Sequence, residues 1–410
     1  MVNAGRYRAA ALALLFTLAA TSRADVIMDW SARADAIAAE RRLPPPVQGR
    51  ALALMHVSMF EAINAIERRY KPYRLQLVAD RNTSREAAAA SAAHAVLTAL
   101  YADQRPALDA QLGADLAAVA EGPAKERGII LGRKAAADLL ELHAEDGAGA
   151  DDYRPFTQAG IYVPTQAVAG YHVRTFKPWV MTSAEQFRAA PPPALSSETW
   201  ARDVNEIRDV GALDSSARSP EQTTVGKFWF LTGARTYNPI VRQVVLAKQM
   251  NLLDCARIYA LTSMAAADAF IAVFEAKYHY NFWRPVTAIR NADLSQNPAT
   301  PRDATWQPLG ETPMHPEYPC AHCISASAVA AALRAVVGDE VGEITVTSNA
   351  APGVTRRWTR LSDYADEVSN ARIWAGFHYR FSTEAAKDMG RKIGELTVAT
   401  QLRPVPARQK

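Results

Sequence analysis

A lysine and an arginine stand in the aromatic stretch Lys277-Tyr-His-Tyr-Asn-Phe-Trp-Arg284-Pro285 of this 410-residue chain. Seven residues correspond to about two helical turns, so on one continuous helix the two cations would lie nearly one above the other. Pro285 predicts the end of such a helix, because the residue before a proline avoids helical backbone angles. Two like charges held so close together indicate an anion that both side chains share.

A second stretch, residues 316–327 (PEYPCAHCISAS), contains two prolines followed by a run of small residues. The pattern predicts a loop that enters a helix close to Cys320, Ala321 and His322. The first N–H groups of a helix have no partner within the helix, and its N-terminus carries a partial positive charge. This stretch is therefore a second candidate for binding an anion.

Arg372 and His378 belong to a third stretch, residues 371–382 (ARIWAGFHYRFS). On one straight helix these two side chains would point about 120° apart. They can converge only if the helix ends or bends near Gly376, or if the long arginine side chain reaches around.

Together the three stretches supply cations and imidazoles in a combination that suits a tetrahedral oxyanion. The cations would hold its oxygens and stabilise the charge of a five-coordinate state. One histidine would attack or coordinate the central atom, and the other would give or take a proton on the opposite side. These candidate residues are Lys277, Arg284, Arg372, His322 and His378.

The order and spacing of these residues resemble the three-part signature of the type 2 phosphatidic acid phosphatase (PAP2) and vanadium haloperoxidase superfamily. The matching motifs are Lys277-x6-Arg284-Pro285, Pro319-Cys320-Ala321-His322 and Arg372-x5-His378. The likeness extends more weakly upstream, through residues 55–66 and 265–269, toward the soluble bacterial haloperoxidase branch. It implies an all-α fold made of helical bundles of the PAP2/haloperoxidase type.

The resemblance also implies a role for each matching residue. His378 would be the ligand of vanadium, or the acceptor of a phosphoryl group, and His322 would be the acid–base residue. Phe274 and His315 would fall in the wall of the pocket on the halide side. The residues that would bind the oxygens of vanadate or phosphate are Lys277, Arg284, Cys320, Ala321 and Arg372.

Three positions depart from the family's pattern. Cys320 stands where the family usually has a serine, which replaces a good hydroxyl donor by a weak thiol. Ala321 stands where a glycine is usual, and it keeps the backbone N–H if its backbone angles permit. Ser382 replaces an aspartate that commonly follows the histidine of the third motif, so the orientation of His378 must come from elsewhere or from a hydroxyl.

Three functions are consistent with this site. The preferred one is a haloperoxidase, in which bound vanadate activates hydrogen peroxide and a halide is oxidised. The alternative is an exported phosphomonoesterase that works through a phosphohistidine, with phosphate in place of vanadate and a phosphate ester as substrate. The third is a non-catalytic exported helical protein whose site has degenerated.

The three cysteines, Cys255, Cys320 and Cys323, leave at least one thiol outside any disulfide within the chain. The pair in Cys320-Ala-His-Cys323 permits a local disulfide in an oxidising compartment. If Cys320 were a free thiol, the helix N-terminus and nearby cations would lower its pKa, and peroxide would attack the thiolate. A free thiol here would argue against haloperoxidase activity.

Most of the chain has the periodicity of helices, and strands are scarce. Residues 145–193 are rich in Gly, Pro, Asp and Tyr and predict a long irregular connection, and residues 343–347 are the best candidate for a strand. The remaining histidines are expected to be structural or exposed, with His279 a candidate for the pocket entrance; they are His56, His94, His143, His172 and His279. Helices are predicted at 51–66, 84–101, 108–120, 124–143, 198–210, 220–231, 239–250, 253–276, 324–337, 362–379 and 383–402.

Residues 1–24 have the basic start, short apolar run and small residues of a secretory signal peptide. We therefore expect a periplasmic or secreted protein with an N-terminal helical region at 25–219 and a catalytic bundle at 220–405. No later apolar stretch approaches twenty residues, which predicts no stable membrane span. A net charge of +4 without basic runs gives no case for nucleic acid. The sequence leaves open whether the chain forms a homo-oligomer.

Overall fold

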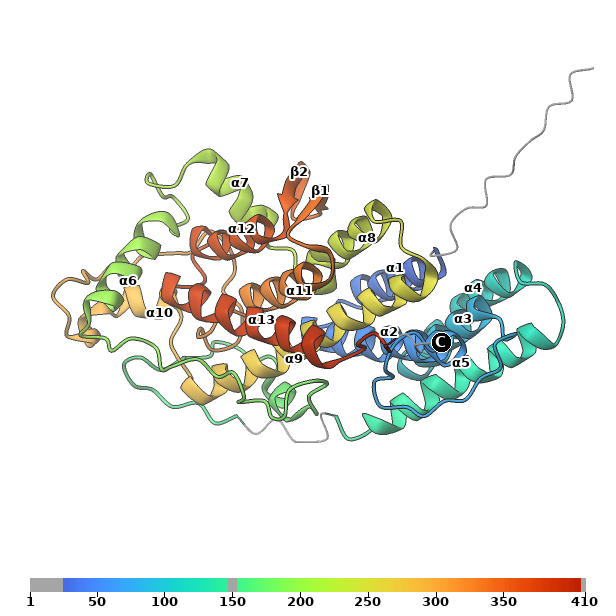
Figure 1. The fold of residues 1–410 in the computed structure, drawn as a ribbon. Coiled ribbons are helices and arrows are strands. Elements are labelled where there is room, and N and C mark those ends of the chain that lie inside the picture. Colours follow the sequence, from blue (N-terminus) through green and yellow to red (C-terminus); the bar gives the residue numbers. More distant parts are fainter. Residues whose placement is uncertain (1–24, 147–152, 407–410) are drawn as a thin grey trace, which may run out of the picture.

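The computed structural model describes residues 25–146 and 153–406, so the predicted signal peptide lies outside the described residues. Helices dominate the described chain, and a single antiparallel hairpin accompanies them (Figure 1). The α-helices are α1 (Asp25–Glu40), α2 (Pro45–Glu67), α3 (Arg85–Leu100), α4 (Arg105–Ala117), α5 (Pro123–Leu142), α6 (Glu198–Val210), α7 (Pro220–Phe228), α8 (Asn238–Ala247), α9 (Leu252–Tyr280), α10 (Pro285–Arg290), α11 (Ala321–Val337), α12 (Leu361–Trp374) and α13 (Arg380–Thr400). The 3₁₀ helices are η1 (Ala102–Gln104), η2 (Tyr171–Thr175), η3 (Gly233–Thr236) and η4 (Ala292–Ser295). The predicted all-α fold is confirmed.

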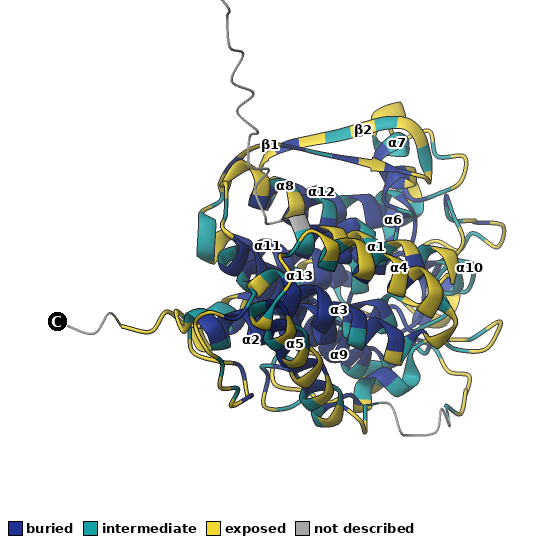
Figure 2. Cartoon of the chain, turned by 90° about the vertical axis from the view of Figure 1, so that its right-hand side faces the viewer, coloured by how far each residue is buried: buried dark blue, intermediate teal, exposed yellow. Residues whose placement is uncertain are grey.

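The long helix α9 lies at the centre, and α2, α11 and α13 pack against it (Figures 1 and 2). The side chain of Asn251 caps its first turn by accepting the N–H of Asp254 at 3.0 Å. By length and composition α9 could cross a membrane, and 94% of its most apolar window is buried inside the protein. The prediction that no later stretch approaches twenty apolar residues was wrong, because a helix surrounded by other helices is apolar on every side.

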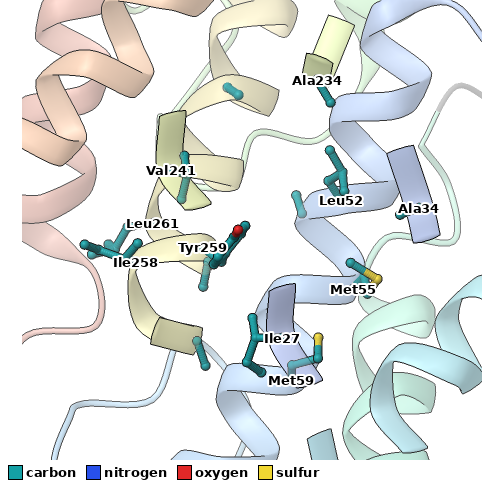
Figure 3. Packing of buried hydrophobic residues seen from close by; sticks show 14 of the residues in the cluster. Ile27, Ala34, Leu52, Met55, Met59, Ala234, Val241, Ile258, Tyr259 and Leu261 are labelled. Carbon is teal, nitrogen blue, oxygen red and sulfur yellow. The ribbon is translucent and has the colours of Figure 1, made fainter. Parts of the chain in front are cut away.

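One hydrophobic core joins the helices before and after residue 219. In Figure 3, Tyr259 of α9 lies among side chains of α1, α2 and α8. The same cluster includes Ile27 near the start of the described chain and Leu402 near its end. The division into an N-terminal region at 25–219 and a catalytic bundle at 220–405 stays a prediction.

Helices α3 and α5 pack closely because both present small residues at their contact. A β-carbon at Gly132 of α5 would meet the carbonyl oxygen of Ala88 at 2.2 Å, and one at Gly128 would meet that of Ser84 at 2.6 Å. The alanine-rich sequence of α3 thus serves two purposes, since alanine favours the helix and lets a second helix approach.

Residues 153–193 form a long irregular connection, as predicted, with η2 as its helical segment. Asp268 fixes this connection to α9. Its carboxylate is fully buried and accepts the backbone N–H groups of Trp179, Val180 and Met181 at 2.7, 2.8 and 2.9 Å. Burial raises the pKa of Asp268 to about 6, while these N–H groups oppose the rise.

The predicted strand at 343–347 is confirmed within β1 (Glu340–Ser348), and it pairs with β2 (Ala351–Arg360), which the sequence did not predict. Ile344 lies opposite Trp358, and both are buried against the helices. The missed strand has an exposed, polar pattern with Pro and Gly near its start, and such a pattern does not predict a strand.

Candidate active site

The first motif lies on two helices, and the expectation of one continuous helix was wrong. Asn281 ends α9 in the left-handed conformation, with φ of 49°. Pro285 occupies the first turn of α10, and the preceding Arg284 is extended, with φ of −76° and ψ of 154°. Arg284 therefore stands at the start of α10 and returns toward the end of α9 by a turn in the chain.

Lys277 is fully buried in the last turn of α9. Its Nζ donates to the carbonyl oxygens of Pro316 and Glu317, each at 2.8 Å, and so joins α9 to the loop of the second motif. Burial lowers the pKa of Lys277 well below its usual value, and the nearby Arg284 lowers it further. An anion bound beside Lys277 would favour its charged form.

Arg284 is buried and contacts both other motifs. It donates through Nε to the carbonyl of His315 at 2.9 Å and through Nη1 to that of Phe377 at 3.0 Å. Its Nη2 lies 2.9 Å from Nδ1 of His315, and Nη1 lies 3.3 Å from Nε2 of His378. Burial lowers its pKa to about 10.

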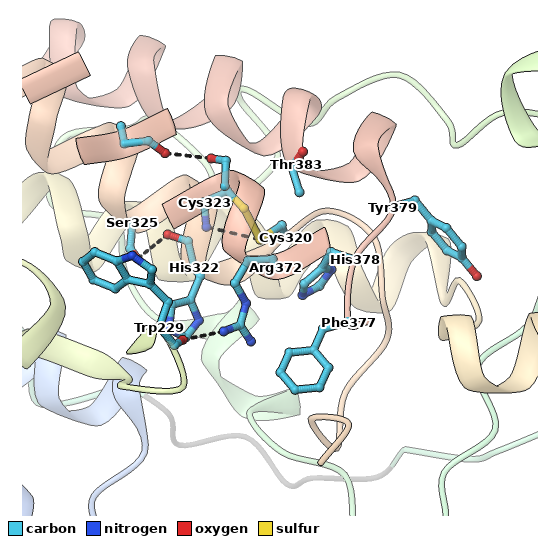
Figure 4. Close-up of a disulfide and its surroundings, with 12 residues drawn as sticks. Trp229, Cys320, His322, Cys323, Ser325, Arg372, Phe377, His378, Tyr379 and Thr383 are labelled. Atoms are coloured by element: carbon cyan, nitrogen blue, oxygen red, sulfur yellow. Dashed lines mark hydrogen bonds between the residues drawn. A yellow bond between two sulfur atoms is a disulfide. The ribbon is translucent and has the colours of Figure 1, made fainter. Parts of the chain in front are cut away.

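The second motif begins α11 as predicted, with Cys320 at the N-cap position. The sulfur of Cys320 accepts the N–H of Cys323 at 3.2 Å and is bonded to the sulfur of Cys323 (Figure 4). A disulfide has no S–H, so the prediction that the side chain of Cys320 binds an oxyanion is corrected. Cys255 is buried and takes no part in a disulfide.

Ala321 and His322 occupy the first turn of α11, where backbone N–H groups point away from the helix. Nε2 of His322 lies 2.7 Å from the carbonyl oxygen of Leu231, which identifies Nε2 as the protonated nitrogen. Burial lowers the pKa of His322 to about 3, and Arg372 contributes to this shift. The ring is therefore neutral near pH 7 and has a lone pair on Nδ1.

In the third motif, α12 ends at Trp374 and Gly376 has φ of 79°, so the chain reverses where the sequence required it. Arg372 and His378 then face the same cavity (Figure 4). Arg372 donates from Nη1 to the carbonyl of Trp229 at 2.6 Å, and its guanidinium lies 4.7 Å from the ring centre of Phe377. Its buried Nε has no hydrogen-bond partner among the described residues.

Glu317 is the site residue that the sequence analysis missed. It is fully buried, and its Oε1 lies 2.8 Å from Nδ1 of His378 and 3.1 Å from the backbone N of Tyr379. Burial raises the pKa of Glu317 to about 7, while Lys277 and Arg284 oppose the rise. The signal in the sequence was a glutamate within the second motif, three residues before Cys320, in a chain that lacks the usual aspartate at Ser382.

The contact with Glu317 fixes the tautomer of His378. Burial and the nearby cations lower the pKa of His378 well below its usual value, so the ring is neutral. Nδ1–H donates to Glu317, and the lone pair of Nε2 is left facing Arg284. A neutral imidazole with a free Nε2 lone pair can serve as a ligand or as a nucleophile.

His315 and Phe274 lie together in the wall of the cavity, with ring centres 5.3 Å apart. Burial, followed by Lys277 and Arg284, lowers the pKa of His315 well below its usual value. His172 also lines the cavity, although the sequence predicted it to be structural or exposed, whereas His279 is exposed and does not line it. The structure thus brings the three motifs together around one cavity of about 310 Å³.

The residues of this cavity fit an oxyanion. Lys277, Arg284 and Arg372 are all buried, and Glu317 is the acidic side chain that faces them. A buried Nε without a partner on Arg372 and the first N–H groups of α11 offer further donors. Among residues 25–146 and 153–406, no group of three or more His, Cys, Asp or Glu side chains could hold a bare metal cation.

Comparisons with known proteins agree with this geometry. Residues 257–405 match the family model of the VCPO second helical-bundle domain. Vanadium chloroperoxidase of Curvularia inaequalis is 25% identical over 467 residues, which cover 84% of this chain and 76% of that protein. A crystal structure described as the first bacterial vanadium-dependent iodoperoxidase superposes with a TM-score of 0.80 at 23% identity, covering 94% of this chain and 98% of the other. An apo-type bacterial vanadium-dependent chloroperoxidase gives a TM-score of 0.66 at 18% identity over 93% and 94% of the two chains.

The fold and the matched domain place this chain in the superfamily of vanadium haloperoxidases and type 2 phosphatidic acid phosphatases. Its relatives are haloperoxidases, so at the level of the family it is a haloperoxidase-like enzyme.

Proposed function

We propose that this protein is a vanadate-dependent haloperoxidase that oxidises a halide with hydrogen peroxide. The observation that carries the proposal is the convergence of three buried cations on the free Nε2 lone pair of His378. A buried positive cluster of this kind is costly unless an anion occupies it. The family supplies vanadate as the anion and peroxide and halide as the small-molecule substrates.

Each residue has a task that follows from its position. Lys277, Arg284 and Arg372 would hold the oxygens of vanadate, assisted by the backbone N–H of Ala321. Nε2 of His378 would be the ligand of the vanadium, and Glu317 keeps that nitrogen free of a proton. When bound, vanadate supplies the activation of peroxide toward attack by a halide.

His322 would move a proton at Nδ1. Its Nε2–H is committed to the carbonyl of Leu231, so the other nitrogen can accept a proton from peroxide and return it to a leaving oxygen. His315 and Phe274 would form the wall where the halide approaches, close to Arg284.

The disulfide removes an objection to this function. A thiolate beside a peroxide-binding site would be oxidised, whereas a disulfide no longer offers a thiolate to peroxide. It also agrees with an oxidising compartment. We propose that residues 1–24 direct export to the periplasm or outside the cell, and N-terminal sequencing of the exported protein would test this by locating the cleavage.

The test uses the mature protein incubated with orthovanadate and then given hydrogen peroxide, bromide or iodide, and a dye that reacts with the oxidised halide. We expect vanadate-dependent halogenation that His378→Ala abolishes and that the exposed control His279→Ala retains. Hydrolysis of a phosphate ester, inhibited by vanadate and without halogenation, would establish the phosphatase instead. Neither activity, despite saturable vanadate binding, would indicate a non-catalytic site.

A further inference from the structure

We infer that the cavity over His322 binds a neutral aromatic molecule of one or two rings, and that this molecule is halogenated while bound. The binding part of this inference stands on the walls of the cavity. The reaction part rests on the proposed function, which must supply the oxidised halide.

The cavity combines apolar walls with a charged floor. Its walls include Pro46 and Val47 from the start of α2, Phe270 and Phe274 from α9, and Met314 from the loop before the second motif. Its floor consists of Arg372, His322 and His378. A largely apolar lining with a few converging polar groups is the usual composition of a site for a small organic molecule.

Hydrogen bonds hold the wall at the start of α2 in place. The buried Gln48 donates from Nε2 to the carbonyl of Leu43 at 2.6 Å and accepts the N–H of Ala234 in η3 at 3.1 Å. A β-carbon at Gly233 would lie 2.2 Å from Oε1 of Gln48, so glycine is required for this close approach. The proline-rich corner is thus fastened to η3 across the cavity.

The opposite wall is fastened in the same way. Ala169 donates its N–H to the carbonyl of Met314 at 2.7 Å and accepts the hydroxyl of Tyr278 at 2.6 Å. Gly170, with φ of 73°, lies so close to Phe274 that a β-carbon would meet its ring at 2.5 Å. Walls tied together by hydrogen bonds need little ordering when a ligand enters, which favours binding.

The charge and size of the cavity select the chemical class. Arg372 on its floor repels organic cations, and an organic anion would compete with the oxyanion for the same cations. A volume of about 310 Å³ lies at the small end of the range of ligand pockets, which suits one or two fused rings. The aromatic edges of Phe270 and Phe274 favour an aromatic guest.

The reaction of such a guest is balanced. The proposed activity converts halide, hydrogen peroxide and a proton into hypohalous acid and water. The ring of the guest then attacks the halogen, a carbon–halogen bond forms, and the halogen–oxygen bond breaks. The ring loses a proton to the departing hydroxide, which leaves as water. A guest held above His322 would meet hypohalous acid before that acid escapes into solution.

Binding is tested first, with 2-naphthol as probe, by calorimetry on the whole protein without peroxide or halide. We expect saturable binding of one molecule, weakened at least about tenfold in Val47→Trp and in Met314→Trp, which fill the cavity. Val78→Trp adds the same side chain at a position that is 89% exposed and outside the cavity, and it should bind like the wild type. Circular dichroism confirms that each variant is folded. Absence of binding to the wild type overturns the inference.

Directed halogenation is tested by competition between 2-naphthol and a phenol attached to dextran, which cannot enter. The enzyme should favour naphthol at least about tenfold more than the hypobromite reagent does, and Val47→Trp should lower this preference toward that of the reagent. A product ratio equal to that of the reagent overturns the directed step. Triiodide formation without any organic acceptor is followed separately, so loss of the proposed haloperoxidase activity is distinguished from loss of the aromatic site.

Discussion

Oε1 of Glu317 lies 2.8 Å from Nδ1 of His378 across 61 residues of sequence, and this contact decides which nitrogen of the histidine faces the cations. The same oxygen accepts the N–H of Tyr379 at 3.1 Å, so Glu317 fixes both the ring and the turn that carries it. It performs the task that the absent aspartate at position 382 would have performed.

Glu317→Gln should weaken the binding of vanadate by about 10- to 100-fold, as changes to the partner of a ligating histidine generally do. An amide accepts Nδ1–H more weakly, and its own N–H₂ can stabilise the tautomer in which Nε2 carries the proton. Vanadate affinity is measured by calorimetry and the pH profile of activity is compared with that of the wild type.

Glu311→Gln is the matched control, since Glu311 is exposed on the same loop. An affinity of Glu317→Gln within about twofold of the wild type, with an unchanged pH profile, would show that Glu317 does not position His378.

Arg372→Lys should lower vanadate affinity by about 10- to 100-fold. Lysine keeps the charge but loses the unpartnered Nε–H and the planar arrangement of donors, and each charge-assisted hydrogen bond contributes about 1.5–3 kcal/mol. Arg357→Lys, at an exposed position of the hairpin, controls for the exchange itself. Equal affinities for the wild type and Arg372→Lys would remove Arg372 from the oxyanion site.

The protein purified without reductant and then denatured should show one reactive thiol, and three after reduction, because Cys320 and Cys323 form a disulfide. Cys255→Ala should show none before reduction. Cys323→Ser leaves a thiol on Cys320 beside the cations, so peroxide should inactivate this variant faster than the wild type. Three thiols in the unreduced wild type would contradict the disulfide.

Asp268 should make the free energy of unfolding fall as the pH rises from about 4 to 6. Its pKa rises on folding from 3.8 to about 6, so in this range the folded state binds more protons than the unfolded state. Asp268→Asn loses this dependence. Although the variant also loses an acceptor for the N–H groups of 179–181, its stability relative to wild type should improve with rising pH, by at most about 3 kcal/mol.

Denaturant titrations at several pH values between 4 and 7 measure this effect, with the exposed Asp214→Asn as the control for removing a carboxylate. A stability difference between Asp268→Asn and the wild type that stays constant over this range would show that Asp268 does not take up a proton on folding.

The sequence by itself determined the helices and the membership of the site. Helical periodicity, the cap at Asn251 and the break at Gly376 depend on residues close together in the chain, so their pattern could be interpreted without the fold. The spacing of the three motifs was sufficient to select the cations and histidines that the structure gathers around one cavity.

Only the tertiary structure decided how these residues face one another. The sequence placed Lys277 and Arg284 on one helix, whereas Asn281 ends that helix and the two cations meet through the loop of the second motif. It left the state of Cys320 open and missed Glu317, because a disulfide and a buried hydrogen bond depend on the distance and direction between two atoms. Periodicity along a chain specifies which face of a helix a residue occupies, but the packing of helices far apart in sequence decides which atoms come within bonding distance.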